Sequence, residues 1–128
     1  MRWFRKDGPK EAWEIDDQGP VGDIEAARKV REICSSVASS AERVAVLFYG
    51  PIDRTKKYET NRYERAKKRA EENVEKISDG LLRDAAIHQV LKLCMKATDV
   101  EGAEALFHRL QTKMIKEAVV AEYPIFCD

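Results

Sequence analysis

Apolar residues recur alternately three and four positions apart along four stretches of this chain, and this spacing is the strongest constraint on its fold. An α-helix turns once in about 3.6 residues, so each set lies along one side of a helix. The four sets are Val30, Cys34, Val37, Ala41, Val44 and Phe48; Tyr63, Ala66, Ala70, Val74, Ile77 and Leu81; Leu82, Ala86, Val90, Leu93 and Ala97; and Ala103, Leu106, Leu110, Met114, Ala118 and Ala121. Helices with one apolar face bury it against each other. The sequence therefore predicts an all-α, single-domain, four-helix bundle.

Capping and breaking residues set the expected limits of these helices. Asp23 is a suitable N-cap for a first helix that runs toward Tyr49 and stops at the Gly50-Pro51 pair. The second helix is expected over 58–77, the third over 81–97, and the fourth from the Thr98-Asp99 cap to about 122. Residues 22–128 would then be the helical domain, with a short C-terminal tail.

The first 21 residues are expected to form an irregular N-terminal arm. Trp3, Phe4 and Trp13 lie there among two Gly-Pro pairs. A few large aromatic side chains can tie a terminus down, so we expect them to pack onto the bundle rather than to bind a partner.

Two alternatives to this arrangement stay open. Residues 44–49 also favour a β-strand, which could pair only with residues 118–126 in a mixed α+β fold. Leu81 continues the apolar set of the second helix in register, so the second and third helices could form one kinked rod. Such a rod would favour a homodimer.

The charge balance excludes a strong overall field. Lys plus Arg and Asp plus Glu each number 23 among 128 residues, so any affinity for nucleic acid or an anionic membrane must be local. Charge in the first seven residues argues against a secretory signal, and the longest uncharged apolar run, 44–52, is too short to cross a bilayer. We expect a cytoplasmic protein without a membrane partner.

Reducing cytosol suits its three cysteines, of which Cys34 and Cys94 are expected to be buried and Cys127 exposed.

Candidate catalytic or metal-binding groups are few. Each of the two histidines follows a carboxylate by one helical turn, Asp84 before His88 and Glu104 before His108, and such a set could hold a metal ion. A helical wheel places both pairs on outer faces, where they are ordinary intrahelical partners. Phosphate-binding glycine loops and nucleophile motifs are absent from the sequence. We therefore expect no enzyme, metal or cofactor.

The separation of basic and acidic residues along the chain indicates function more clearly than these candidate groups do. Residues 54–69 contain eight bases and two acids, whereas residues 11–25 contain six acids and no base. Bases at a helix N-terminus are not explained by the helix dipole. The candidate binding residues are Arg54, Lys56, Lys57, Tyr58, Arg62, Arg65, Lys68 and Arg69, with Tyr49 and Tyr63 as further aromatic groups. Alternatively, the basic and acidic segments neutralise each other within the molecule.

Two functions follow from this pattern. The leading hypothesis is a non-enzymatic interaction or adaptor protein that docks on another macromolecule, a protein above all, or serves as a subunit of an assembly. The alternative is an accessory RNA- or DNA-binding protein that contacts phosphates through residues 54–69 and stacks bases on its tyrosines.

Overall fold

The computed structural model describes residues 11–14 and 22–127, and this part of the chain is helical without any strand. Its elements are η1 (Ala12–Glu14), α1 (Asp23–Ser36), α2 (Ala38–Val46), α3 (Arg54–Val74), α4 (Gly80–Lys96), α5 (Val100–Phe107), α6 (Lys113–Glu122) and η2 (Pro124–Phe126). The predicted all-α class is therefore confirmed, and the mixed α+β alternative for residues 44–49 is wrong. The predicted number of four helices is also wrong, because two of the expected helices are each divided.

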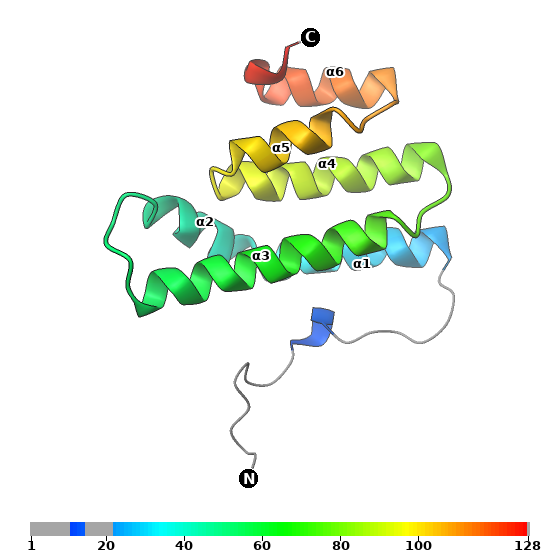
Figure 1. Ribbon diagram of the computed structural model, residues 1–128. Coiled ribbons are helices and arrows are strands. Elements are labelled where there is room, and N and C mark those ends of the chain that lie inside the picture. Colours follow the sequence, from blue (N-terminus) through cyan, green and yellow to red (C-terminus); the bar gives the residue numbers. More distant parts are fainter. Residues whose placement is uncertain (1–10, 15–21, 128) are drawn as a thin grey trace.

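The helices form a layered stack in which α4 lies between the layer of α1, α2 and α3 on one side and α5 and α6 on the other (Figure 1). α3 packs against α1, α2, α4 and the η1 turn. α4 contacts α1 and α2, and it also carries α5 and α6, so that α6 forms the outermost layer. The α2–α3 connection lies at one end of the stack, and the start of α1 and the start of α4 lie at the other (Figure 1).

The core between α1, α2 and α3 combines alanines with larger apolar side chains such as Val30, Ile33 and Val74. Ala26 of α1, Ala41 of α2, and Ala66 and Ala70 of α3 are all fully buried. Because the distance between packed helices depends on the side chains at the contact, alanine lets these helices approach closely. Tyr63 is the largest side chain buried in this layer.

The first predicted helix bends at Val37, which belongs to neither α1 nor α2. Val37 still donates its N–H to the Ile33 carbonyl and accepts the N–H of Ala41, so hydrogen bonding continues through the bend. Four serines flank it, and serine competes for backbone hydrogen bonds and weakens helices. They are Ser35, Ser36, Ser39 and Ser40. Val37 itself is fully buried, so the apolar spacing gives no sign of the bend.

Three of the helices have aspartate caps, and α3 begins four residues before the expected position 58. Asp53, Asp79 and Asp99 each accept a backbone N–H from the first turn of α3, α4 and α5 respectively. The Asp79 cap separates α3 from α4, so the single-rod alternative is wrong. The sequence predicted Asp23 as the N-cap of the first helix, and this prediction is wrong. Gly22 occupies the N-cap position of α1, and the Asp23 carboxylate instead accepts the backbone N–H groups of residues 78 and 79.

The fourth predicted helix is divided because Asp84 binds its backbone. The fully buried Asp84 carboxylate accepts the N–H groups of Gln111 and Thr112 at 2.9 and 2.6 Å, in the connection between α5 and α6. Asp84 therefore does not lie on an outer face as predicted. The break also turns the apolar set after Leu110 outward: Met114, Ala118 and Ala121 are exposed, whereas Val119 is buried.

The terminal segments bear out part of the prediction. Trp13 of η1 is only 4% exposed and joins the core, as expected of an arm that packs onto the bundle. Trp3 and Phe4 lie outside the described residues. Cys34 and Cys94 are buried and Cys127 is exposed, as predicted. Within residues 11–14 and 22–127, every helix is too short or too polar to cross a lipid bilayer.

Replacing Asp84 with alanine should lower the free energy of unfolding by about 2–4 kcal/mol, because two backbone N–H groups lose a charged acceptor. Urea unfolding followed by circular dichroism measures this loss. The exposed Glu104→Ala is the matched control and should change stability by no more than about 0.5 kcal/mol. Equal stability of the two variants would contradict the proposed role of Asp84.

Candidate docking surface

Three of the predicted binding residues hold the N-terminal segment instead of facing solvent. Arg62 pairs with both carboxylate oxygens of Glu11, at 2.8 and 2.6 Å. Arg65 lies 3.4 Å from the Glu14 carboxylate, and Arg69 donates to the Glu14 backbone carbonyl. For these residues the internal neutralisation that the charge pattern suggested is confirmed.

We call Arg62, Arg65 and Arg69 the arginine clamp, and Arg62 connects it to the core. Arg62 also donates to the hydroxyl of the buried Ser40 on α2, at 2.7 Å. Trp13 donates its indole N–H to Glu11, so the aromatic ring and the ion pair are held together. The hydrogen bond from Arg62 is the main reason why the pKa of Glu11 lies below its usual value. Two-point pairing of this kind is the strong form of an arginine–carboxylate contact.

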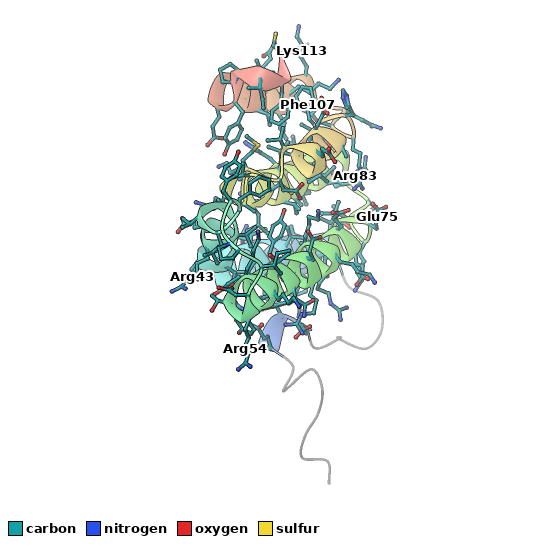
Figure 2. The ribbon with its side chains drawn as sticks, turned by 60° about the vertical axis from the view of Figure 1, so that its left-hand side comes forward. Arg43, Arg54, Glu75, Arg83, Phe107 and Lys113 are labelled. Atoms are coloured by element: carbon teal, nitrogen blue, oxygen red, sulfur yellow. The ribbon has the colours of Figure 1, made fainter. Side chains whose placement is uncertain are left out.

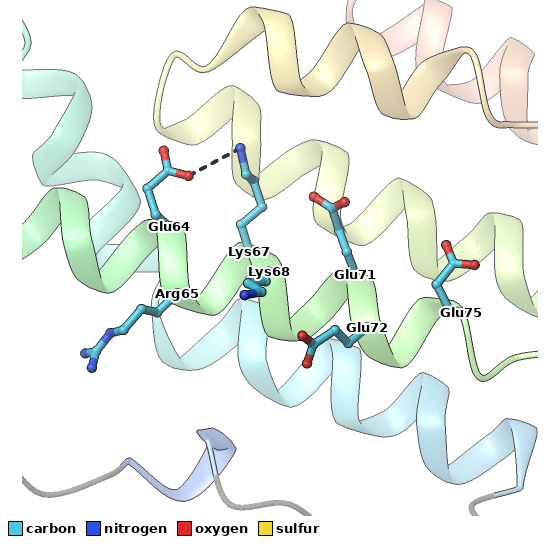
Figure 3. Close-up of a pocket in the computed structure, with 7 residues that line it drawn as sticks. All are labelled: Glu64, Arg65, Lys67, Lys68, Glu71, Glu72 and Glu75. Atoms are coloured by element: carbon cyan, nitrogen blue, oxygen red, sulfur yellow. Dashed lines mark ion pairs between the residues drawn. The ribbon is translucent and has the colours of Figure 1, made fainter.

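The outer face of α3 carries charges of both signs. A shallow hollow of about 550 Å³ is lined by α3 alone, by Glu64, Arg65, Lys67, Lys68, Glu71, Glu72 and Glu75 (Figure 3). Glu64 pairs with Lys67 there, at 3.6 Å. Four carboxylates against three bases would repel a phosphate backbone laid along this face.

The other predicted binding residues remain at the surface. Arg54, Lys57 and Lys68 are exposed and form no ion pair with another described residue. Tyr58 is 59% exposed. Lys56 is half-buried because its ammonium group donates to two backbone carbonyls of the α2–α3 connection. Except for Lys68, these residues gather at the start of α3.

Exposed apolar side chains gather at the same end of the molecule. The described residues expose ten large hydrophobic side chains, and half of them fall between 46 and 58. We call these five the apex surface: Val46, Phe48, Tyr49, Ile52 and Tyr58. Tyr49 is 94% exposed, Val46 81% and Ile52 74%. The α2–α3 connection that carries most of them lies at the left-hand end of the helices in Figure 1. Phe48 had been expected in the core, but it lies beyond the end of α2.

A groove of about 470 Å³ adjoins the apex surface. Val44 lines it from α2, Phe48 from the α2–α3 connection, and Lys56 and Thr60 from α3. Residues 97–101, from the α4–α5 turn and the start of α5, form the other wall. One of these last residues is Val100, an exposed hydrophobic side chain outside the five of the apex surface. Apolar side chains around an open hollow are typical of interaction sites.

Asp99 fixes the far wall of this groove. Its carboxylate accepts from the Tyr63 hydroxyl at 2.7 Å and from the Lys67 ammonium at 2.9 Å. Burial raises the pKa of Asp99, but these hydrogen bonds and that from the Gly102 N–H outweigh burial and hold the pKa below its usual value. Tyr63 is 1% exposed, so it cannot stack on a base as the sequence suggested.

Thr98 gives the groove wall an unusual backbone. Its φ is +61°, a conformation that a β-branched residue rarely adopts. The cause is local, because the Asp99 N–H donates to the Cys94 carbonyl in the manner of a helix C-cap that normally uses glycine.

Neither predicted histidine pair forms. His88 approaches Glu122 of α6 at 3.5 Å, and burial followed by repulsion from Lys92 lowers its pKa. His108 is exposed beside the Phe107 ring. Across the described ranges, His, Cys, Asp and Glu side chains are nowhere grouped in threes that could hold a metal ion.

Burial raises the pKa of Cys34 to about 12 and that of Cys94 to about 11, which leaves both thiols unreactive.

Sequence reasoning found only part of this surface. It identified Tyr49 and Tyr58, with Arg54 and Lys57 beside them, but assigned Val44 and Phe48 to the buried face of the first helix. The residues that end this helix could have predicted that the other apolar side chains are exposed. A Gly50-Pro51 pair directly after a run of large apolar residues leaves the last of them without a neighbouring helix.

No protein-family model, curated protein or solved structure matches this chain. Any proposal about its function therefore depends on its own residues.

Acidification should destabilise this protein through three carboxylates. Glu11, Asp84 and Asp99 have folded-state pKa values below the unfolded values of 4.5 for Glu and 3.8 for Asp. Their contribution is fully present above those values and is lost as the pH falls through the lower folded values. Urea unfolding at pH 7, 5, 4 and 3 should show falling stability below about pH 4.5. Glu11→Gln should flatten this fall, whereas the exposed control Glu117→Gln should not. Constant stability from pH 7 to 3 would contradict this account.

Proposed function

We propose that this protein is a non-enzymatic docking module that binds another protein through the apex surface and the adjoining groove. The observation that carries the proposal is the concentration of exposed hydrophobic side chains there, with Tyr49 almost wholly exposed. Such a surface costs solubility and contributes nothing to the bundle's own packing, which is why exposed apolar patches usually mark interaction sites.

The arrangement of the surface supports this proposal. Aromatic side chains such as Phe48, Tyr49 and Tyr58 are enriched at protein interfaces because they supply large contact areas with little conformational freedom to lose. The groove offers a concave seat beside them, and the side chains of Arg43 and Arg54 project from the outside of the molecule (Figure 2). A central apolar area with a charged rim is the usual plan of an interface.

Single-stranded nucleic acid is the second candidate, on one observation. Tyr49 and Tyr58 are exposed near Arg54 and Lys57, and such a mixture can stack bases and contact phosphates. The site is smaller than the sequence suggested, since Arg62, Arg65 and Arg69 are occupied by the N-terminal segment. Aliphatic Val46 and Ile52 also offer no stacking face.

Removing two apex side chains should abolish partner capture. Tyr49→Ser with Ile52→Ser should reduce the amount of protein co-purified from the native cell at least tenfold, because two central interface residues are each worth about 2 kcal/mol. The matched control is Ile24→Ser with Leu81→Ser, which removes two exposed side chains at the opposite end of the stack. Circular dichroism verifies that both variants fold. Equal capture by the two variants, or none by the wild type, would refute the proposal.

The nucleic-acid candidate has its own test. It predicts that a 20-nucleotide single-stranded RNA binds at 50 mM salt and weakens steeply by 200 mM, because bound phosphates release counterions. Arg54→Ala with Lys57→Ala should then reduce the slope of log affinity against log salt by about 1 or more. Lack of binding at 50 mM salt, measured by fluorescence anisotropy, would eliminate this candidate.

A further inference from the structure

The apex surface is positively charged as well as apolar. Residues 43–58 contain four bases, Arg43, Arg54, Lys56 and Lys57, and a single acid, Asp53. Asp53 is occupied as the cap of α3, and Arg43 lies 3.7 Å from Glu59. Arg54 and Lys57 are exposed and pair with no described residue. The partner must therefore bring negative charge to this end of the molecule.

This charge argues against a second copy as the occupant. A two-fold dimer buries the same surface of both subunits in one interface. Arg54 and Lys57 of the two copies would then add four positive charges to that interface, and like charges gathered at an interface oppose association. The apolar area alone would favour a dimer, but its basic edge does not.

The groove distinguishes a protein segment from other anionic partners. Val44, Phe48 and Val100 give it apolar walls that can surround one protruding side chain. A bilayer surface has no such projection, and a phosphate backbone has no use for an apolar cleft. Lys56 and Glu64 both line the groove, and Glu64 lies eight positions after Lys56 on α3, which corresponds to about 12 Å along the helix. That length suits about two turns of a helix.

Charge also sets where the partner's carboxylates lie. Glu64 lies about two turns along α3 from Lys56, at the end of the groove away from the apex, whereas Lys56 lies at the apex end with Arg54 and Lys57 nearby. Carboxylates would be repelled at the first end and attracted at the second.

We propose that the groove and apex surface bind an acidic amphipathic helix of a partner protein, with an apolar side chain between Phe48 and Val100 and carboxylates beside Arg54 and Lys57. This inference rests on the docking function proposed above and names the partner's chemistry. It corresponds to the known mode in which a helix inserts anchors spaced by three or four residues into a groove.

Two labelled 14-residue amphipathic peptides test this inference on the full chain. Both carry leucines spaced three and four residues apart, and their other positions are mainly glutamate in one and lysine in the other. The glutamate peptide should bind at least tenfold more tightly than the lysine peptide in fluorescence anisotropy. Arg54→Glu with Lys57→Glu should abolish this preference. The matched double reversal Lys113→Glu with Lys116→Glu, on the distant α6, should leave it unchanged within twofold. Val100→Trp, which fills the groove, should weaken the glutamate peptide at least fivefold.

Several results would overturn the inference. They are equal binding of the two peptides, no binding of either at 1 mM, and insensitivity to the Arg54 and Lys57 reversals. A dimer in light scattering that Tyr49→Ser dissociates would assign the surface to a second copy. Tighter binding of single-stranded RNA or phosphatidylserine vesicles would assign it to those partners. If the peptides fail while the Tyr49 and Ile52 variant still loses captured protein, the partner chemistry is wrong and the docking function stands. If both fail, the docking function falls as well.

Discussion

The packing of α1 and α2 against α3 is the constraint on which the rest of the structure depends. Tyr63 is the largest fully buried side chain, and it lies on the face of α3 that also buries the small Ala66 and Ala70. Its hydroxyl reaches Asp99, which caps α5 and fixes the groove wall. Packing in the core thus determines the shape of the surface at the end of the stack, since interiors are close-packed and transmit small displacements.

α3 presents four different environments around one helix. Its core face is apolar, its clamp face holds Glu11 and Glu14, its outer face carries mixed charge, and its first turn reaches the apex surface. One run of bases in the sequence is therefore divided between residues that hold the N-terminal segment and residues that stay exposed. Arg62 and Arg65 face the N-terminal segment, while Arg54 and Lys57 remain available. A helix of 21 residues can separate these tasks because its side chains point in every direction around the axis.

The spacing of apolar residues was sufficient to predict the helical class and most core residues of α3 and α4, and the capping pattern located the helix start at Asp99. It could not reveal the two breaks. At Val37 the apolar spacing and the hydrogen bonds both continue through the bend. Between α5 and α6, residues 108–112 contain neither glycine nor proline, and the break depends on a carboxylate 27 positions away. The apex surface escaped prediction for a similar reason, since periodicity identifies a face but not whether a neighbouring helix covers all of it.

The two buried cysteines make this fold open to a direct kinetic measurement. Cys34 of α1 and Cys94 of α4 lie in the core, whereas Cys127 is exposed. In the native state a thiol-specific reagent reaches Cys127 at once, and each buried sulfur only when its layer opens. With Cys127 replaced by serine, the rate of modification would report how often the helices separate, and comparing the two sites would show whether α1 and α4 part together or one at a time.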